Sequence, residues 1–589
     1  MRLAVWTPCL CLLACNLCCA TASAEDKVEV EVTGLTEELE NNVLAYLSIA
    51  DLGEKKGGAE ATQPVTESNV RRLHGAARAE IERALKPFGY YEPTIRSQLQ
   101  HVGMDWIARY SVDPGSLTVV AGVEIRAVGE GSEEPAVRTA LAAAAFARGD
   151  PLRHAKYETA KTQLFEAARG AGYIDAKYER AEIRVRREER EADIHLVLAT
   201  GPRYYFGPIA IEQEILDPKF VGRYVRIAPG EPFDSNRLIE LQLALGDSGY
   251  FSEVTVDVQR AAAVDNRIPI VVHTSPRATQ EYTVGFGYGT DTGPRLKLGT
   301  ELRRLNRRGH RFNVDLRLSD IDTTAAVEYR IPVKNVETDT LSFRGSLGTR
   351  EIGDLDTEQV SLGMTLHDTW HGFERGLYLL GDRERWTESG AELTENVFYP
   401  GMELTSRTVV DAESLFTRKG YSWTADLRGG SESFGSSTSF LRMRLSGNLV
   451  LPLAERMRFL FRAEYGAMNV DDLSVLPPSQ RFFAGGDRSV RGYRYQRLGP
   501  TDAAGAVVGG RYLVTASAEV DYLFFRNYGA AVFYDAGNAG NEPWPGVKRS
   551  VGMGMRWRTP VGMLRIDIAH PLDDPDEDYR LHLSIGSDL

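Results

Sequence analysis

The sequence predicts three α+β repeats, each ordered strand, helix, helix, strand, strand, followed by a transmembrane antiparallel β-barrel of about sixteen strands. Three observations lead to this prediction. A Gly-Tyr pair recurs at the end of three helical patterns, strict apolar and polar alternation fills the second half, and no later stretch approaches the length of an apolar membrane helix. Because backbone groups must be hydrogen-bonded within lipid, a closed barrel is the spanning structure that remains.

The N-terminal segment, residues 1–24, is typical of a secretory signal peptide. All five cysteines lie in its first twenty residues, and an apolar run leads to Ala22-Ser23-Ala24, an A-x-A cleavage site. Leu12-Leu13-Ala14-Cys15 offers a lipoprotein cleavage site as an alternative. Cleavage after Ala24 would leave a chain without cysteine, which fits a bacterial envelope protein better than an extracellular animal domain.

The repeats are recognised by their helix ends. Gly89, Gly172 and Gly249 are spaced by 83 and 77 residues, and each follows apolar residues at helical spacing. Glycine at this position adopts the left-handed conformation that stops a helix, and the aromatic residue after it starts a strand. The three repeats are expected over residues 25–115, 116–201 and 202–277.

From residue 278 to residue 589 the helical period disappears. Apolar and polar residues alternate, as in the run Glu281 to Tyr288, and many runs reach about ten residues, which is the length that crosses a membrane at barrel tilt. Counting these runs gives about sixteen strands, an even number as in single-chain bacterial barrels. Asp426 and Asp567 fall on the other face, where we expect a wet lumen.

One segment of this half, from about Asp471 to Gly510, does not alternate, and the strand count places it as the sixth outer loop. It is rich in glycine, basic and aromatic residues, so we expect it to fold back into the lumen with Arg491 near a carboxylate. Asp535 lies mid-strand on the lumen parity, where a bidentate ion pair with Arg491 would offset its burial. The alternatives are an exposed Arg491 in a solvated loop and an Asp535 that faces lumenal water.

Several motifs together resemble the outer-membrane protein assembly superfamily, and within it the outer-membrane subunits of the translocation and assembly module. They are the signal peptide, the three repeats, the barrel, Val490-Arg491-Gly492-Tyr493-Arg494, the F-x-D-x-G motif that contains Asp535, and the ending Leu583 to Leu589. Many barrels end in an aromatic residue, so Leu589 departs from the pattern and is expected to weaken recognition of this barrel by the assembly machinery.

The resemblance implies a fold, a site and partners. The repeats would be periplasmic POTRA domains that bind polypeptide partly by edge-strand addition, and Arg491, Gly492 and Tyr493 would lock the sixth loop against the strand that bears Asp535. It also implies outer-membrane proteins or autotransporters as clients and a TamB-like, inner-membrane-anchored subunit as partner.

The two terminal strands of the barrel form a candidate lateral gate. Gly285, Gly287 and Gly289 lie on alternate positions of the first strand, and glycine within a strand weakens pairing. An open seam would expose backbone groups that can pair with an incoming client strand. The gate residues are Tyr282, Gly285, Gly287 and Gly289 on the first strand and Leu581, Leu583 and Ile585 on the last. Alternatively, these glycines only relieve crowding under lumenal aromatic side chains.

Composition and motifs also exclude some functions. The net charge of −13 gives no reason to expect nucleic acid as a partner, and outer-membrane lipid is the expected surroundings. No H-E-x-x-H, G-x-S-x-G or P-loop motif occurs, so we expect no enzyme, cofactor or metal. The alternative functions are a two-partner-type pore that exports a soluble exoprotein and a passive porin. A porin needs no 250-residue periplasmic half, and a steady large conductance would distinguish it.

Overall fold

A computed structural model describes residues 27–52, 65–103, 105–413, 416–559, 562–574 and 579–586. The predicted signal peptide, its cysteines and Leu589 lie outside these residues. Among the residues described, none of the helices has the length and apolar character needed to cross a membrane.

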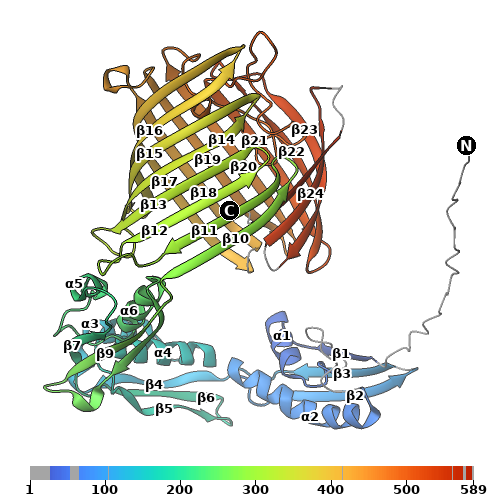
Figure 1. The fold of residues 1–589 in the computed structure, drawn as a ribbon. Coiled ribbons are helices and arrows are strands. Elements are labelled where there is room, and N and C mark those ends of the chain that lie inside the picture. The colour runs from blue at the N-terminus through green and yellow to red at the C-terminus, as the bar shows by residue number, and fades with distance from the viewer. Residues whose placement is uncertain are drawn as a thin grey trace, which may run out of the picture. The chain divides into compact units, whose positions relative to one another are not determined.

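Three small three-stranded sheets precede the large sheet, and each carries two helices as predicted (Figure 1). The first repeat contains β1 (Val28–Thr33), α1 (Glu37–Tyr46), α2 (Glu67–Leu85), β2 (Thr94–Val102) and β3 (Asp105–Asp113). The second contains β4 (Val119–Val128), α3 (Pro135–Ala143), α4 (His154–Gly170), β5 (Lys177–Arg186) and β6 (Glu191–Ala199). The third contains β7 (Tyr205–Glu212), α5 (Pro218–Val221), α6 (Ser235–Asp247), β8 (Phe251–Val258) and β9 (Arg267–Pro276).

The last strand of each repeat lies at the centre of its sheet, in the orders β1-β3-β2, β4-β6-β5 and β7-β9-β8. In the first two repeats the central strand is parallel to the first strand and antiparallel to the second. Each sheet therefore has two edge strands. Gly89, Gly172 and Gly249 have φ values of 89°, 98° and 75°, which confirms that they end helices in the left-handed conformation.

The core of the first repeat illustrates how the helices attach. Val70, Ala77 and Ile81, on one face of α2, are buried against the sheet residues Ala108 and Tyr110. Alternate residues of β3 are buried, which is the period of a strand with one covered face. The helical and strand periods in the sequence thus meet in one apolar layer.

The barrel is a sixteen-stranded sheet over the described part of residues 280–586, and its strands follow one another in chain order. They are β10 (Gln280–Gly289), β11 (Gly293–Leu302), β12 (Arg311–Ser319), β13 (Asp322–Pro332), β14 (Thr340–Ile352), β15 (Leu355–Trp370), β16 (Phe373–Glu388), β17 (Ala391–Glu413), β18 (Phe416–Gly430), β19 (Phe440–Ala454), β20 (Met457–Val470), β21 (Tyr512–Leu523), β22 (Tyr528–Gly540), β23 (Lys548–Thr559), β24 (Gly562–Pro571) and β25 (Arg580–Gly586). All fifteen consecutive pairings are antiparallel. The predicted strand number is confirmed.

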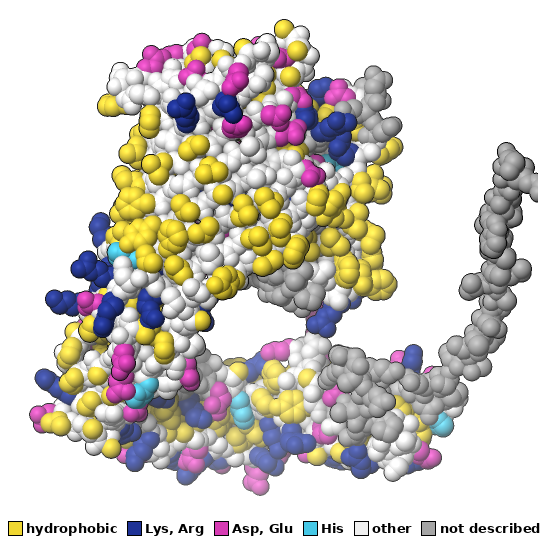
Figure 2. Space-filling view, in the orientation of Figure 1, with side chains coloured by type: hydrophobic (Ala, Val, Ile, Leu, Met, Phe, Trp, Pro, Cys, Tyr) yellow, Lys and Arg dark blue, Asp and Glu magenta, His cyan; other side chains and the backbone are white. Residues whose placement is uncertain are grey.

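The outer surface of the barrel is apolar. On β15 the alternate residues Val360, Leu362 and Met364 are exposed, although they are large and hydrophobic. Hydrophobic side chains gather over the barrel wall in Figure 2, while charged side chains gather towards one end. An apolar outer band is what a lipid environment requires of a barrel.

The third repeat contacts two turns at the end of the barrel where β10 begins. The Tyr250 hydroxyl donates to the carbonyl oxygen of Gly309 at 2.6 Å, and Arg311 donates to the carbonyl oxygen of Ser248. Arg226 donates to Asn335 Oδ1 at 2.8 Å. These contacts involve the turns before β12 and before β14.

Candidate functional site

Loop six, residues 471–511 between β20 and β21, is folded against the inner wall of the barrel. Leu476, Phe482 and Val490 are buried in one apolar cluster with inward-facing residues of six strands, Val397 on β17 among them. The loop therefore fills part of the lumen. Arg491 is 4% exposed, so the alternative of a solvated arginine is excluded.

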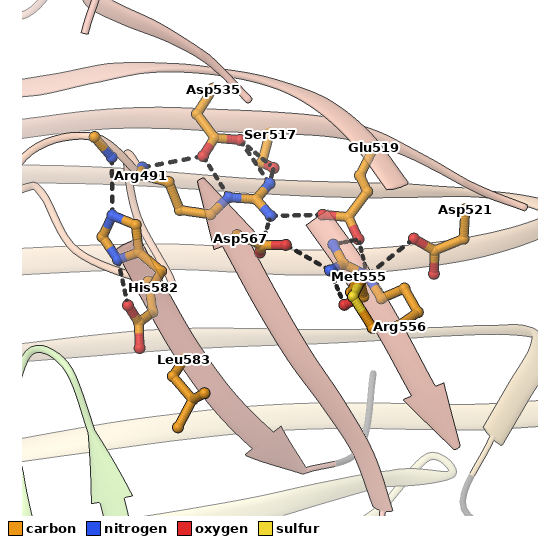
Figure 3. Close-up of polar contacts among 12 residues, drawn as sticks. Arg491, Ser517, Glu519, Asp521, Asp535, Met555, Arg556, Asp567, His582 and Leu583 are labelled. Atoms are coloured by element: carbon orange, nitrogen blue, oxygen red, sulfur yellow. Dashed lines mark hydrogen bonds and ion pairs between the residues drawn. The ribbon is translucent and has the colours of Figure 1, made fainter. Parts of the chain in front are cut away.

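Arg491 and Asp535 are in contact, as the sequence predicts (Figure 3). The arginine donates from Nε to Asp535 Oδ2 at 2.8 Å and from Nη2 to Oδ1 at 3.0 Å, which is a bidentate pair. The backbone N–H of Arg491 also donates to Oδ2, at 3.0 Å, and the Ser517 hydroxyl donates to Oδ1 at 2.6 Å. Asp535 is fully buried, whereas Val532 and Tyr534 are exposed on the outer face, which confirms the parity assignment.

Arg491 has further partners that the sequence did not predict. Its Nη1 donates to Glu519 Oε2 at 2.7 Å and to Asp567 Oδ2 at 2.9 Å, and its guanidinium lies 3.4 Å from the centre of the Phe533 ring. Four donor groups of one residue thus hold the loop to β21, β22 and β24. Alternation on β21 could have revealed Ser517 and Glu519, because they share the lumen parity with each other, but parity alone does not say which strand lies under the loop.

A second arginine completes this group of charges. Arg556 on β23 is fully buried and donates to Glu519 Oε1 at 2.6 Å and to Asp567 Oδ1 at 2.5 Å. We call Arg491, Glu519, Asp535, Arg556 and Asp567 the loop-six cluster. Buried charges cost desolvation free energy unless they are paired, and removal of one member leaves the others uncompensated. The cluster therefore favours one position of the loop.

The structure corrects the expectation that Asp426 and Asp567 face a wet lumen. Asp426 and Asp567 are 5% and 4% exposed and do not face water. Asp426 accepts from Arg428 Nε at 2.8 Å, and Asp567 belongs to the loop-six cluster. Asp567 lies under Arg491 of loop six, whereas Asp426 is enclosed by Arg428, Tyr378 and Arg442 on the barrel wall.

A few side-chain contacts and loop six bridge the seam between β10 and β25. Over the described residues no strand pairing joins these two strands. The backbone N–H of Leu583 donates to Thr290 Oγ1 at 3.3 Å, just beyond the end of β10. Ile585, Gly285 and Gly287 line a common cavity. The other residues that the sequence predicts for a gate lie at the same strands: Tyr282 and Leu581 are exposed, and Gly289 ends β10.

His582 on β25 fastens the last strand to loop six. Its Nε2 accepts from the backbone N–H of Gly492 at 3.0 Å, so its proton is assigned to Nδ1, which lies 2.6 Å from Asp487 Oδ1. The backbone N–H of Asp487 in turn donates to Asp291 Oδ2 at 2.9 Å, in the turn after β10. Both termini of the barrel are thus attached to the loop that contains Arg491.

Gly492 and Tyr493 are brought into the same place. Gly492 has a φ of 93° and its N–H faces His582, and the Tyr493 hydroxyl donates to the carbonyl oxygen of Arg549 at 3.3 Å. Asp291, Asp487 and His582 have ligand atoms within 4.8 Å of one another. Both nitrogens of His582 are hydrogen-bonded, so this geometry favours a hydrogen-bonded link between the strands over a metal site.

Comparisons with known proteins place these features in a family. Residues 412–589 match the Omp85 superfamily domain, residues 29–114 match "POTRA domain TamA domain 1", and residues 204–277 match a POTRA model described as a surface antigen variable number repeat. Residues 412–589 therefore form an Omp85 superfamily domain, and two of the regions before it match POTRA domains. The barrel of this chain belongs in the outer membrane and its POTRA domains lie in the periplasm.

Individual relatives agree with this family. The outer membrane protein assembly factor BamA of Nitratidesulfovibrio vulgaris is 25% identical over 431 residues, which cover 68% of this chain and 53% of that protein. The match thus spans about half the length of this relative. The crystal structure of BamA from Haemophilus ducreyi lacking POTRA domains 1–3 has the same fold, with a TM-score of 0.66, 16% identity, and coverage of 80% of this chain and 99% of that one. The relatives are named for assembly and not for catalysis.

Proposed function

We propose that this chain is an outer-membrane assembly factor that inserts or translocates β-barrel and autotransporter-type clients through the seam between β10 and β25. One observation carries the proposal: the two strands are adjacent at Thr290 and Leu583, yet share no strand pairing over the described residues. Each strand therefore presents backbone donors and acceptors to a client strand, whose own polar groups would be paired on entering lipid.

The POTRA domains supply the second part of the proposed function. Each has two edge strands, and an extended polypeptide can add to such an edge through main-chain hydrogen bonds. Because residues 29–114 match a POTRA model named for TamA, we propose that the chain is the TamA-type subunit of a translocation and assembly module. The proposed partner of these domains is a TamB-like subunit anchored in the inner membrane.

The loop-six cluster has a defined role in this proposal. Loop six is bonded through Arg491 to β21, β22 and β24, and through Asp487 and Gly492 to the last strand and the first turn. The proposed role of Arg491, Gly492, Tyr493 and Asp535 is to hold the barrel wall rigid beside a seam that opens. Tyr282, the three glycines of β10, Leu581, Leu583 and Ile585 are proposed to meet the client strand.

A disulfide across the seam tests the proposal. The pair Thr290→Cys and Leu583→Cys joins neighbouring residues, because the backbone nitrogen of Leu583 lies 3.3 Å from Thr290 Oγ1. The chain's own cysteines all lie in the first twenty residues. We expect the oxidised variant to reduce the folded yield of a client barrel by at least about 10-fold, and a reductant to restore it, since a closed seam offers no free edge.

The matched control is Ser342→Cys with Thr365→Cys, which joins directly opposed residues of the paired strands β14 and β15. This disulfide should leave client assembly unchanged. Equal client yields from the oxidised seam variant and the control would overturn the gate. A two-partner-type pore would still export a soluble exoprotein with the seam locked, because its cargo passes through the lumen.

A further inference from the structure

A cavity of about 690 Å³ lies inside the barrel beside the seam, and more positive than negative side chains line it. Its lining includes seven cationic and three anionic side chains. The cations are Arg295, Lys297, Arg317, Arg350, Arg442, Arg444 and Arg481, and the anions are Asp322, Glu351 and Glu464. Such a volume is typical of a site for a small ligand.

The anions in this lining are already paired. Glu464 accepts from Arg444 at 2.6 Å, Asp322 lies 3.6 Å from Arg350, and Glu351 accepts from Arg497 at 2.7 Å. They therefore leave no carboxylate in the lining for the cations of β11 and β12.

The cations of β11 and β12, namely Arg295, Lys297 and Arg317, lie close together. Lys297 on β11 is the direct cross-strand neighbour of Arg317 on β12. Lys297 has Asp315 at 3.7 Å, and neither Arg317 nor Arg295 has an ion-pair partner among the described residues. Like charges directly opposite one another in a sheet repel, so this arrangement lowers stability unless an anion lies between them.

Glycine keeps the space in front of these side chains open. Gly285 is the cross-strand neighbour of Lys297, and Gly287 is the neighbour of Arg295. With no side chain on β10 at these positions, the cations border the cavity directly. The cavity also reaches Ile585 on β25, so it lies at the seam, where no strand pairing between described residues separates lumen from lipid.

The position along the barrel points to the kind of anion. Arg295 is two residues from the start of β11, and Arg317 is two residues from the end of β12, both at the end of the wall opposite the start of β10. This is the outer-leaflet end of the wall, at which phosphate-bearing lipid headgroups lie. Phe286, beside these glycines on β10, is 83% exposed on the outer face, where acyl chains would contact it.

We propose that Arg295, Lys297 and Arg317 bind the phosphate group of an anionic lipid whose headgroup enters the lumen through the seam while its acyl chains stay in the membrane. Lys and Arg donors match phosphate oxygens in charge and hydrogen bonding. The surrounding membrane supplies this ligand continuously, whereas an acidic client strand would need its own carboxylates at matching positions. The lipid would neutralise the like-charge pair and occupy the seam between clients.

The experiment measures binding and does not require client assembly, so it can fail independently of the proposed function. The full chain, purified in a neutral detergent, is titrated calorimetrically with dihexanoyl phosphatidic acid, dihexanoyl phosphatidylcholine and inorganic phosphate. We expect phosphatidic acid to bind at least about 10-fold more tightly than either of the other two, and more weakly as salt rises, because salt screens the attraction.

The variant Lys297→Gln/Arg317→Gln should weaken phosphatidic acid binding at least about 10-fold. Its matched control, Arg330→Gln/Arg375→Gln, removes two cations that are ion-paired and lie outside the cavity lining, and should bind as the parent does. Equal affinity in the first variant and the parent would overturn the site. Equally tight binding of inorganic phosphate would overturn the lipid assignment, and so would displacement of phosphatidic acid by an equimolar Glu-rich peptide.

Discussion

On strands β23 and β24, Arg556 lies directly opposite Arg565, and on strands β11 and β12, Lys297 lies directly opposite Arg317. The first pair is surrounded by Glu519, Asp521 and Asp567, all within 3.2 Å of Arg556. The second pair has one carboxylate, Asp315, at 3.7 Å. Two like charges that face each other across neighbouring strands are therefore compensated on one side of the seam and nearly uncompensated on the other.

The difference indicates which side of the seam is held in place. Under loop six, charges are buried and connected, so movement would break several bonds at once. On β10 to β12, across the seam, charges are exposed and glycines replace side chains, and a single backbone hydrogen bond from β25 reaches the turn after β10. The first arrangement restrains the wall, and the second is consistent with the proposal that this part of the wall separates and binds an anion.

Arg491→Ala should produce the largest effect, because it removes the cation shared by Asp535, Glu519 and Asp567. Loss of one partner from a buried ion pair costs about 3–5 kcal/mol, so the free energy of unfolding in detergent should fall by about that amount. Urea titration monitored by heat-modified gel mobility measures it.

Arg491→Lys is the control for this prediction. It keeps the charge but lacks the planar fork, and should recover part of the stability. Limited trypsin digestion at loop six gives an independent readout, since the loop should become accessible in Arg491→Ala. A loop as resistant to trypsin as in the parent would contradict the assigned role of Arg491.

His582→Ala should have a smaller effect, confined to the seam. It leaves the Gly492 N–H and the Asp487 carboxylate without their partner, which costs about 1–3 kcal/mol for a buried polar group. Hydrogen exchange read by mass spectrometry should show faster exchange in β25 and loop six but unchanged exchange in β15 and β16. Ser584→Ala on the same strand is the control, and equal exchange in both variants would exclude His582 as the link.

Much of this architecture could be predicted because it depends on local periodicity. The helix ends at Gly89, Gly172 and Gly249 and the sixteen strands follow from backbone conformation and from alternation, which neighbouring residues determine. The contact between Arg491 and Asp535 could be predicted because a buried carboxylate on the lumen-facing side of a strand needs a cation as partner.

The partners of loop six that were missed depend on folding at long range. Glu519 and Asp567 reach Arg491 only because β21 and β24 lie under the loop, and His582 reaches Gly492 across 90 residues of sequence. Alternation along a strand tells which face of the sheet a residue lies on. It does not tell how far along the barrel axis the residue lies, which strand register and tilt determine. The expectation of a wet lumen around Asp426 and Asp567 was wrong for the same reason, since Tyr378 and Arg442 beside Asp426 come from other strands and Arg491 beside Asp567 comes from loop six.

The smallest predicted effect is a gain in stability, whereas the substitutions above lower stability, so it tests the difference between the two sides of the seam most directly. Arg317→Gln should raise the free energy of unfolding by about 0.2–1 kcal/mol, because it removes a like charge opposite Lys297 that no built-in carboxylate neutralises. Arg556→Gln, the matched change on the other side, should lower it, because Glu519 and Asp567 lose their cation. Parallel urea titrations in a lipid-free neutral detergent give both values. Adding dihexanoyl phosphatidic acid should cancel the gain in stability of Arg317→Gln relative to the parent, because the anion stabilises only the chain that keeps both cations. If both substitutions lower the free energy of unfolding without lipid, the two sides of the seam do not differ in this way.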